Sequence, residues 1–217
     1  MPLRPVIMNH QLIEVIKDKS ILTPAVKLIL HKGTKVIWKD YSDRPMWVRK
    51  TWGDVMVNNE FAILDRLQGI KGIPNAIRKT HNGLLIEYIE GRFLNKFSAS
   101  ELPYEIIGKL ENLIAEIHKR CVVHLDLAQR KNILITHDFT PYIIDFANAL
   151  YLRPNVALAR AFFDYLRLID KGSLLKFKNR YFPDKMTVEE KKYLKRFWAI
   201  RKWWFLSPKT FRERDKV

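Results

Sequence analysis

The sequence predicts an α+β fold in two parts: a small antiparallel sheet that carries one helix, and then a mainly helical part. The first observation is a series of short apolar segments separated by turn residues within 1–90, as in a chain of antiparallel strands. The second is the recurrence of apolar residues at helical spacing within 54–67 and again within 106–117. The third is a later pair of short apolar segments that ends in an acidic residue. We therefore expect one lobe at 1–90 and a second lobe at 91–217.

The elements of the first lobe follow from alternating apolar segments and turn residues. We expect strands at 25–30, 35–39, 76–78 and 84–89, with turns at 31–34 and 81–83. Between the two pairs of strands, 54–67 carries apolar residues at Val57, Phe61 and Leu64, which predicts a helix. Glu60 lies beside this apolar stripe. Lys39 closes the second strand, and Lys50 stands shortly before the helix.

The second lobe opens with a long helical pattern. Its apolar stripe, a typical core-facing surface, consists of Ile106, Leu110, Leu113 and Ile117. His118 at the end of this pattern is expected at the surface. A hairpin follows, with its first strand at 132–135, a turn through His137 and Asp138, and a second strand that ends before Asp145. Another helical pattern runs through 161–169.

Three polar side chains stand out in the stretch between Val122 and Leu150. Asp126 follows the long helical pattern, Asn132 opens the hairpin and Asp145 closes it. Two carboxylates and an amide at one edge of a hairpin form an oxygen-rich site. Such a site suits a hard cation such as Mg²⁺, with water and phosphate as its remaining ligands. The alternative for each acid is an ordinary helix cap or turn former.

This stretch resembles the catalytic core of the protein-kinase superfamily. His124-Leu125-Asp126-Leu127 matches its H-x-D-L loop, Asn132 its downstream asparagine, and Asp145-Phe146 the start of D-F-G. The resemblance implies that Asp126 orients or deprotonates an attacking hydroxyl, and that Asn132 and Asp145 hold Mg²⁺ on the phosphates of ATP. It also implies that His124 is a packing and hydrogen-bonding residue.

The resemblance also assigns the nucleotide-gripping residues. Lys39, which ends a V-x-x-K strand, would hold the α- and β-phosphates, with Lys50 as its competitor. Glu60 would pair with the lysine, and the spacing favours Lys39 because Lys50 lies too close to the helix. Backbone groups from Glu87 to Ile89 would meet the adenine edge. No G-x-G-x-x-G occurs, so the cover of the phosphates would come from the stretch Ile16 to Pro24, with Lys17, Lys19 and Ser20 as its polar residues.

Two departures from the kinase pattern concern the catalytic stretch. The asparagine lies five residues after the aspartate in protein kinases, whereas Asn132 lies six residues after Asp126, and Lys131 occupies the five-residue position. Either the loop bulges by one residue or Asn132 is not the ligand. Ala147 replaces the glycine of D-F-G. Because alanine loses the freedom to adopt positive φ but removes no ligand, we expect a less mobile segment.

The segment after Asp145 is short. About ten residues separate Phe146 from the next helical pattern, and no A-P-E occurs. This abbreviation resembles RIO-type kinases and the bacterial lipopolysaccharide-core sugar kinases. The second group also shares the degenerate phosphate loop and a turn like that at 67–74.

The C-terminal stretch 185–217 is basic and aromatic. It contains eleven Lys or Arg against four acidic residues. Tyr193, Phe197, Ile200 and Trp204 fall on one helical face, and Trp198, Trp203 and Phe205 widen the aromatic surface. A basic amphipathic helix of this kind is able to lie in an anionic membrane interface. The alternative is a helix whose aromatic face packs on the second lobe.

These observations predict a phosphotransferase that uses ATP and Mg²⁺ and has a reduced, bilobal, protein-kinase-like fold. The favoured acceptor is a sugar hydroxyl of an anionic glycolipid, the lipopolysaccharide core, with a protein Ser or Thr as the alternative. A pseudokinase that binds nucleotide without turnover and a nucleic-acid-associated binding module are rivals from other classes. Nucleic acid ranks behind the other partners, and peripheral contact with an anionic membrane surface is one further expectation.

Overall fold

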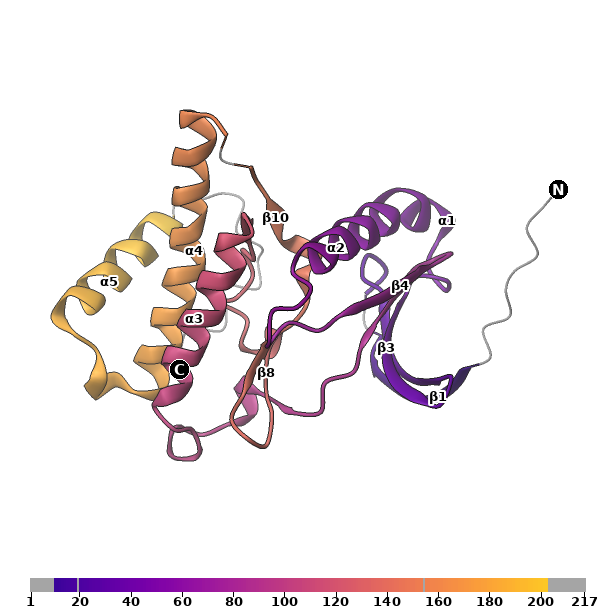
Figure 1. Cartoon of the computed structure of the whole chain (residues 1–217), viewed down its shortest axis with the longest axis horizontal. Helices are drawn as coiled ribbons and strands as arrows, with labels where there is room; N and C mark the ends of the chain where they lie inside the picture. Colours follow the sequence, from indigo (N-terminus) through magenta and orange to yellow (C-terminus); the bar gives the residue numbers. More distant parts are fainter. Residues whose placement is uncertain (1–9, 19, 154, 203–217) are drawn as a thin grey trace.

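The fold has two parts, as Figure 1 shows for the whole chain. The computed structural model describes residues 10–18, 20–153 and 155–202. An antiparallel sheet with helix α2 (Asp54–Arg66) forms one part, and helices α3 (Glu105–Lys119), α4 (Ala157–Tyr181) and α5 (Val188–Lys202) dominate the other. The α+β fold with a small sheet lobe and a mainly helical lobe, predicted from the sequence, is confirmed.

The sheet has five antiparallel strands in the order β1-β2-β3-β5-β4. The strands are β1 (His10–Lys17), β2 (Ala25–His31), β3 (Thr34–Asp40), β4 (Ala76–Thr80) and β5 (Gly83–Glu87). Lys32 and Gly33 join β2 to β3 with φ values of 51° and 78°. Positive φ at both central residues is typical of a two-residue hairpin turn whose twist matches the strands. The expected strand at 84–89 ends at Glu87.

Strand β1 is absent from the sequence-based prediction. It lies at the edge of the sheet and pairs only with β2 among the described strands. All its residues except its two ends are exposed. Half-buried strands are recognised in a sequence by their alternation of apolar and polar residues. Neither face of β1 is buried, so its sequence does not need this alternation.

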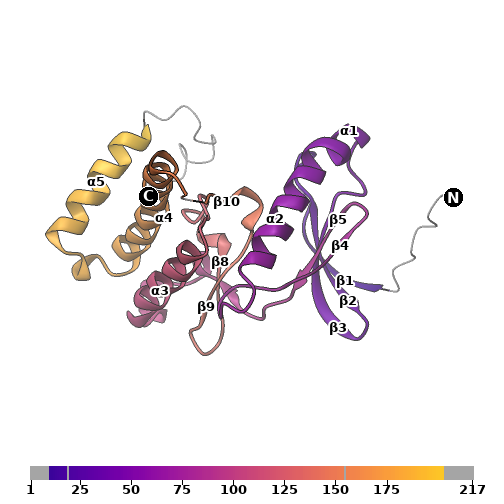
Figure 2. The ribbon, with the colours of Figure 1, turned by 45° about the horizontal axis from the view of Figure 1, so that its top comes forward.

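Helix α2 lies on the side of the sheet that faces the helical part (Figure 2). It is preceded by a short helix α1 (Met46–Val48) and a π-helical turn (Arg49–Gly53). Ile63 and Leu64 in α2 and Leu67 just after it are at most 2% exposed. The helix contacts β4 and β5 of the sheet and the turn Phe146–Asn148 of the second lobe.

Short strands and 3₁₀ turns connect the helices of the second lobe. The strands are β6 (Arg92–Phe93), β7 (Val122–Val123), β8 (Ile133–Ile135), β9 (Pro141–Ile143) and β10 (Leu150–Tyr151). The 3₁₀ turns are Leu94–Lys96, Ala99–Glu101, Arg130–Asn132, Phe146–Asn148 and Pro183–Lys185. The sheets are ordered β6-β8-β9 and β10-β7. The hairpin predicted between Asn132 and Asp145 is the pair β8 and β9.

A single apolar core joins the two lobes. It contains Leu64 of α2, Leu84 of β5 and the predicted stripe of α3, in which Ile106, Leu110, Leu113 and Ile117 are 6% exposed or less. Gly72 lies where the two lobes meet, with φ of 100°. A Cβ there would lie 2.8 Å from both Leu113 Cδ2 and the Pro141 carbonyl oxygen, so only glycine fits.

Helix α5 packs on α4 with its aromatic face. The Tyr193 hydroxyl donates to the Leu168 carbonyl at 3.3 Å, and the Tyr193 and Phe197 rings stack at 6.4 Å. This is the packed alternative of the sequence analysis for these two residues. The side chains of Trp198, Ile200, Trp203, Trp204 and Phe205 lie outside the described residues. In the part of the chain that the structure describes, no helix is long and apolar enough to cross a membrane.

Candidate active site

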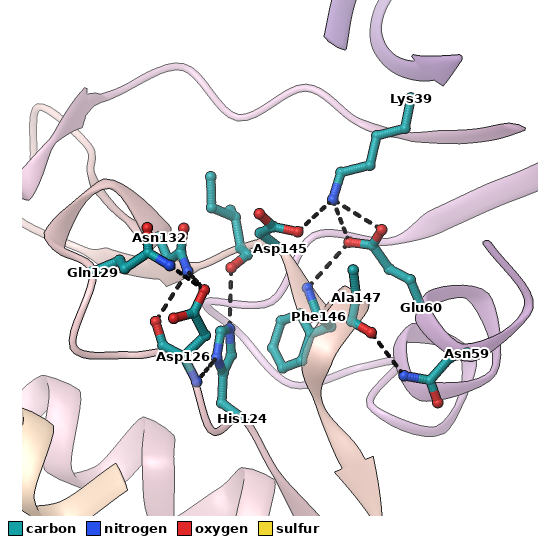
Figure 3. A network of polar contacts seen from close by, with 11 residues as sticks. Lys39, Asn59, Glu60, His124, Asp126, Gln129, Asn132, Asp145, Phe146 and Ala147 are labelled. Atoms are coloured by element: carbon teal, nitrogen blue, oxygen red, sulfur yellow. Dashed lines mark hydrogen bonds and ion pairs between the residues drawn. The ribbon is translucent and has the colours of Figure 1, made fainter. Parts of the chain in front are cut away.

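The site begins with a buried lysine that bridges the two lobes (Figure 3). The Lys39 ammonium group of β3 contacts both carboxylate oxygens of Glu60 at 2.7 and 2.8 Å and Asp145 Oδ1 at 2.8 Å. The Lys39 side chain is 12% exposed and that of Glu60 is 3% exposed. A charge that is buried to this extent requires partners of opposite sign. The structure therefore joins β3, α2 and the end of the β9 hairpin at one point.

The charges of this cluster reinforce one another. Burial alone would lower the pKa of Lys39, but Asp145 and Glu60 outweigh it and raise that pKa above its ordinary value. The Lys39 charge in turn lowers the pKa of Asp145 to about 2 against the effect of burial. Burial raises the pKa of Glu60, and the Lys39 ammonium opposes this rise. Lys39 is thus a cation and Asp145 an anion at neutral pH.

The competitor Lys50 takes no part in this cluster. It lies exposed in the π-helical turn that precedes α2. The spacing between the strand and the helix predicted Lys39 as the partner of Glu60, and the structure contains this pair.

Helix α2 also holds the segment that follows Asp145. Glu60 Oε1 accepts a hydrogen bond from the Phe146 backbone N–H at 3.1 Å. The Asn59 side-chain amide donates to the carbonyls of Ala147 and Ala149 at 3.0 and 2.9 Å. Asn59 is a contact that the sequence analysis missed.

The replacement of glycine by Ala147 is accommodated without positive φ at that residue. Ala147 lies within the 3₁₀ turn Phe146–Asn148. The left-handed conformation falls instead on Asp145, with φ of 65°, and aspartate tolerates this region better than most residues. The alanine therefore requires no strain in the observed arrangement.

Asp126 lies in a loop that is fixed by its own hydrogen bonds. Its backbone N–H donates to His124 Nδ1 at 3.3 Å, and His124 Nε2 faces the Ile144 carbonyl at 3.1 Å. Asp126 Oδ2 accepts from the side-chain amides of Gln129 and Asn132. Both contacts use Oδ2, and no side-chain hydrogen bond to Asp126 Oδ1 occurs among the described residues. His124 is fully buried and acts as the packing and hydrogen-bonding residue that the resemblance implied.

The additional residue between Asp126 and Asn132 is absorbed by the 3₁₀ turn Arg130–Asn132. This turn leaves Lys131 exposed and buries Asn132 to 2%. The Asn132 amide nitrogen donates to the Asp126 carbonyl at 3.0 Å, and the Asn132 carbonyl accepts from Ile144 N–H at 2.9 Å. Asn132 and Asp145 are thus at the same end of the β8–β9 hairpin, and the loop before Asn132 bulges by one residue.

Asp170 of α4 is a residue of this site that the sequence analysis missed. It is fully buried, and its carboxylate accepts from the backbone N–H groups of His124 at 2.9 Å and Leu125 at 3.0 Å. It also contacts His118 Nε2 at 2.9 Å. The expectation of a surface His118 is wrong, because this histidine is only 9% exposed and pairs with a buried acid. A single acid within a helical pattern gave no signal for either role.

The connection between the lobes starts at the end of β5. The Glu87 carboxylate accepts from both the backbone and the side-chain N–H groups of Asn75, at 2.9 and 2.7 Å. Its backbone N–H donates to the Asn75 carbonyl at 2.9 Å. The side chain is therefore a brace for the connection, and Ile89 is half-buried two residues further on.

The donor set at the hairpin end suits a magnesium ion. Asn132 uses its amide nitrogen for Asp126, which leaves its side-chain oxygen as a ligand, and Asp145 contributes an anionic carboxylate. No group of three or more His, Cys, Asp or Glu side chains that could hold a metal ion occurs among the described residues. One amide and one carboxylate are nevertheless the few protein ligands that Mg²⁺ takes when phosphates and water complete its shell.

Comparison with known proteins places the fold. No known family pattern matches the chain, and no curated protein matches it. A crystal structure of the Rio2 kinase-ADP/Mg²⁺-phosphoaspartate complex from Chaetomium thermophilum is similar, with a TM-score of 0.58 and 19% sequence identity. The match covers 85% of this chain and 60% of that chain. The chain therefore has a reduced protein-kinase-like fold, as expected from the sequence.

Proposed function

We propose that this protein is a phosphotransferase that moves the γ-phosphate of Mg²⁺-ATP to a hydroxyl group. The observation that carries the proposal is the Lys39–Glu60–Asp145 cluster, which joins the two lobes. The loop that carries Asp126 lies beside this cluster (Figure 3). Phosphoryl transfer requires positioning and charge neutralisation more than covalent chemistry by the protein. A fixed cation, a divalent-metal donor set and a free carboxylate oxygen meet these requirements.

Each residue has a defined part in this proposal. Lys39, held by Glu60, binds the α- and β-phosphates, and Asp126 Oδ1 accepts the hydroxyl proton of the acceptor. Asn132 and Asp145 hold Mg²⁺, which would offset the negative charge of the phosphates. Backbone groups from Glu87 to Ile89 meet the adenine edge. ADP and Mg²⁺ in the similar Rio2 kinase structure support these cofactors.

The favoured acceptor is a sugar hydroxyl of an anionic glycolipid such as the lipopolysaccharide core. The short segment between the turn at 146–148 and the start of α4 at Ala157 supports it, because so short a segment offers little surface for docking a peptide. The net charge of +16 favours an anionic acceptor as well. A protein Ser or Thr is the second candidate, favoured by the likeness to a RIO-type fold.

Nucleotide binding is tested by thermal unfolding with and without Mg²⁺-ATP. A ligand at about 100 times its dissociation constant adds roughly 2.7 kcal/mol to the free energy of unfolding. We expect a magnesium-dependent stabilisation in the wild type that is lost in Asp145→Asn and kept in the control Lys50→Met. Absence of stabilisation at millimolar ATP in the wild type would contradict the proposal.

Phosphate transfer is tested separately with labelled ATP and a panel of envelope glycolipids and proteins. Asp126→Ala is expected to abolish transfer and to retain the nucleotide-dependent stabilisation, since Asp126 contacts the acceptor and not the nucleotide. Wild-type binding without transfer to any acceptor would favour the pseudokinase. Salt-sensitive binding of DNA or RNA without a nucleotide effect would favour the nucleic-acid module.

A further inference from the structure

Lys17 is placed at the active site by an irregularity in β1. Val15 pairs with Lys27 and Lys17 pairs with Val26, so Ile16 is an additional residue in the strand. Without this bulge, Ile16 would lie opposite Val26 and Lys17 would point to the other face of the sheet, because side chains alternate along a strand. Bulges of this kind re-aim a side chain, often beside a functional site.

The strand register places Lys17 on the same face of the sheet as Lys39. Val26 of β2 pairs with Lys39 of β3. Lys17, Val26 and Lys39 therefore form one row across three strands, and residues in such a row share a face of the sheet. The two lysines lie on the side of Glu60 and Asp145, whereas Lys27 lies on the opposite face with Asp40 at 2.7 Å.

The surroundings of Lys17 agree with this placement. Burial lowers its pKa first, the positive charges of Lys131 and Lys39 lower it further, and the carboxylates of Asp145 and Asp126 oppose the change. Lys17 is half-buried, and within the described residues neither Lys17 nor Lys131 forms an ion pair or a hydrogen bond through its ammonium group. Lys17 of the sheet lobe is thus an unpaired cation near these two acids, and Lys131 lies next to Asn132 in the turn Arg130–Asn132 of the second lobe.

Arg44 holds both ends of the turn that follows Lys17. The Arg44 guanidinium contacts the Asp18 carboxylate, and its Nε donates to the Thr23 carbonyl at 2.9 Å. Arg44 therefore ties both ends of the turn between β1 and β2 to the segment after β3. A glycine-rich loop binds phosphate with its backbone amides, but the stretch from Lys17 to Pro24 contains no glycine.

We propose that Lys17 and Lys131 form a cationic clamp for the terminal phosphates of the nucleotide, with Lys17 in place of a glycine-rich loop. The inference rests on the proposed function; it selects Lys17 from the stretch that was expected to cover the phosphates and adds Lys131 from the second lobe. Lys17 approaches the phosphates from the sheet lobe and Lys131 from the loop of Asp126. The clamp binds phosphate through side-chain charge and not through backbone amides.

The test is calorimetric titration with Mg²⁺-AMP-PNP, an ATP analogue that is not hydrolysed, and with adenosine. We expect Lys17→Met and Lys131→Met each to weaken AMP-PNP binding about tenfold or more, the loss of one charge-assisted hydrogen bond. Adenosine binding should stay unchanged, because adenosine has no phosphate. Lys17→Arg should retain most of the affinity, and the exposed Lys50→Met is the matched control for loss of one surface charge.

The outcomes separate this inference from the proposed function. Wild-type affinity for AMP-PNP in Lys17→Met and Lys131→Met would overturn the clamp and leave the phosphotransferase proposal intact. No binding of AMP-PNP to the wild type would instead contradict the proposed function. Unchanged nucleotide affinity with a raised KM for a phosphorylated acceptor would assign the two lysines to the acceptor and so also overturn the inference.

Discussion

Asp170 shows how one buried side chain fixes the conformation of the loop that carries Asp126. Its two carboxylate oxygens accept from consecutive backbone N–H groups, those of His124 and Leu125, and from the ring of His118. Leu125 has φ of 64°, a left-handed conformation that is uncommon for leucine. Strained residues of this kind persist only where surrounding contacts fix them. Asp170 thus holds the turn that carries Asp126, the residue that we propose to face the acceptor.

Loss of this carboxylate should be costly to the fold. Asp170→Ala leaves three buried donors without an acceptor, at about 1–3 kcal/mol for each. We expect the free energy of unfolding, measured by urea denaturation, to fall by about 3 kcal/mol or more. Asp170→Asn keeps one accepting oxygen, so it should remain folded but transfer phosphate more slowly.

The exposed Asp164 on the same helix is the matched control. Among the described residues, it forms an ion pair with Arg167, one turn along α4, at 3.3 Å. Asp164→Ala should therefore change the stability by less than about 0.5 kcal/mol, as for most surface substitutions. Equal stability of the two alanine variants would remove Asp170 from its structural role.

Part of the site was predictable from the sequence at the level of single residues, and part was not. Lys39 and Glu60 could be paired because a strand and its following helix constrain where their side chains meet. Asp170 lies 46 residues from His124, and Asn59 lies 88 residues from Ala147. Such contacts depend on how the lobes pack, and no local pattern in the sequence records them.

At the scale of elements, the contact between α4 and α5 depends on one small residue. A Cβ on Gly172 of α4 would lie 2.6 Å from the Phe197 ring of α5. Lys178 of α4 and Glu190 of α5 strengthen the same contact with hydrogen bonds of 2.7 and 2.8 Å. The close approach of the two helices therefore explains a glycine in the middle of a helix, where it is otherwise unfavourable.

Two glycine substitutions separate helix propensity from helix packing. Gly108 in α3 has no atom within 4 Å of a Cβ built on it. Gly108→Ala should therefore stabilise the protein by about 1 kcal/mol, the difference in propensity. Gly172→Ala gains the same propensity but crowds Phe197, and overpacking costs about 1–3 kcal/mol. Urea denaturation should show a gain for Gly108→Ala and no gain or a loss for Gly172→Ala. An equal gain in both would mean that α5 yields without cost.

Most of the elements that the sequence predicted have a buried face. β2, β3, α2 and α3 each turn apolar residues towards a core, and that requirement imposes the periodicity from which they were read. β1 carries the bulge that places Lys17, but its residues are exposed and no periodicity marks it. The strand that carries Lys17, the residue that we propose in place of a glycine-rich loop, was thus the element least visible in the sequence.

In the molecule as a whole, one apolar core spans the two lobes, and ion pairs link the side chains of the candidate site. Core residues of α2, β5, α3 and β8 belong to a single cluster. In the candidate site, Lys39 of the sheet lobe forms an ion pair with Asp145 of the second lobe. Because the core is continuous, the lobes need no ligand to stay together, and a nucleotide would act on an arrangement that already exists.

The charge of the whole chain should make its stability depend on salt in an unusual direction. The formal net charge is +16 at pH 7, and self-repulsion of a large net charge destabilises the compact state. Salt screens this repulsion, with a Debye length of about 10 Å at 0.1 M. We expect the melting temperature at pH 7 to rise as NaCl increases from low to physiological concentration. The sequence pI is about 9.9, so the same titration near pH 9.9 should show little change, because the net charge there is close to zero. A melting temperature that falls with salt at pH 7 would show that the ion pairs of this fold outweigh its net charge.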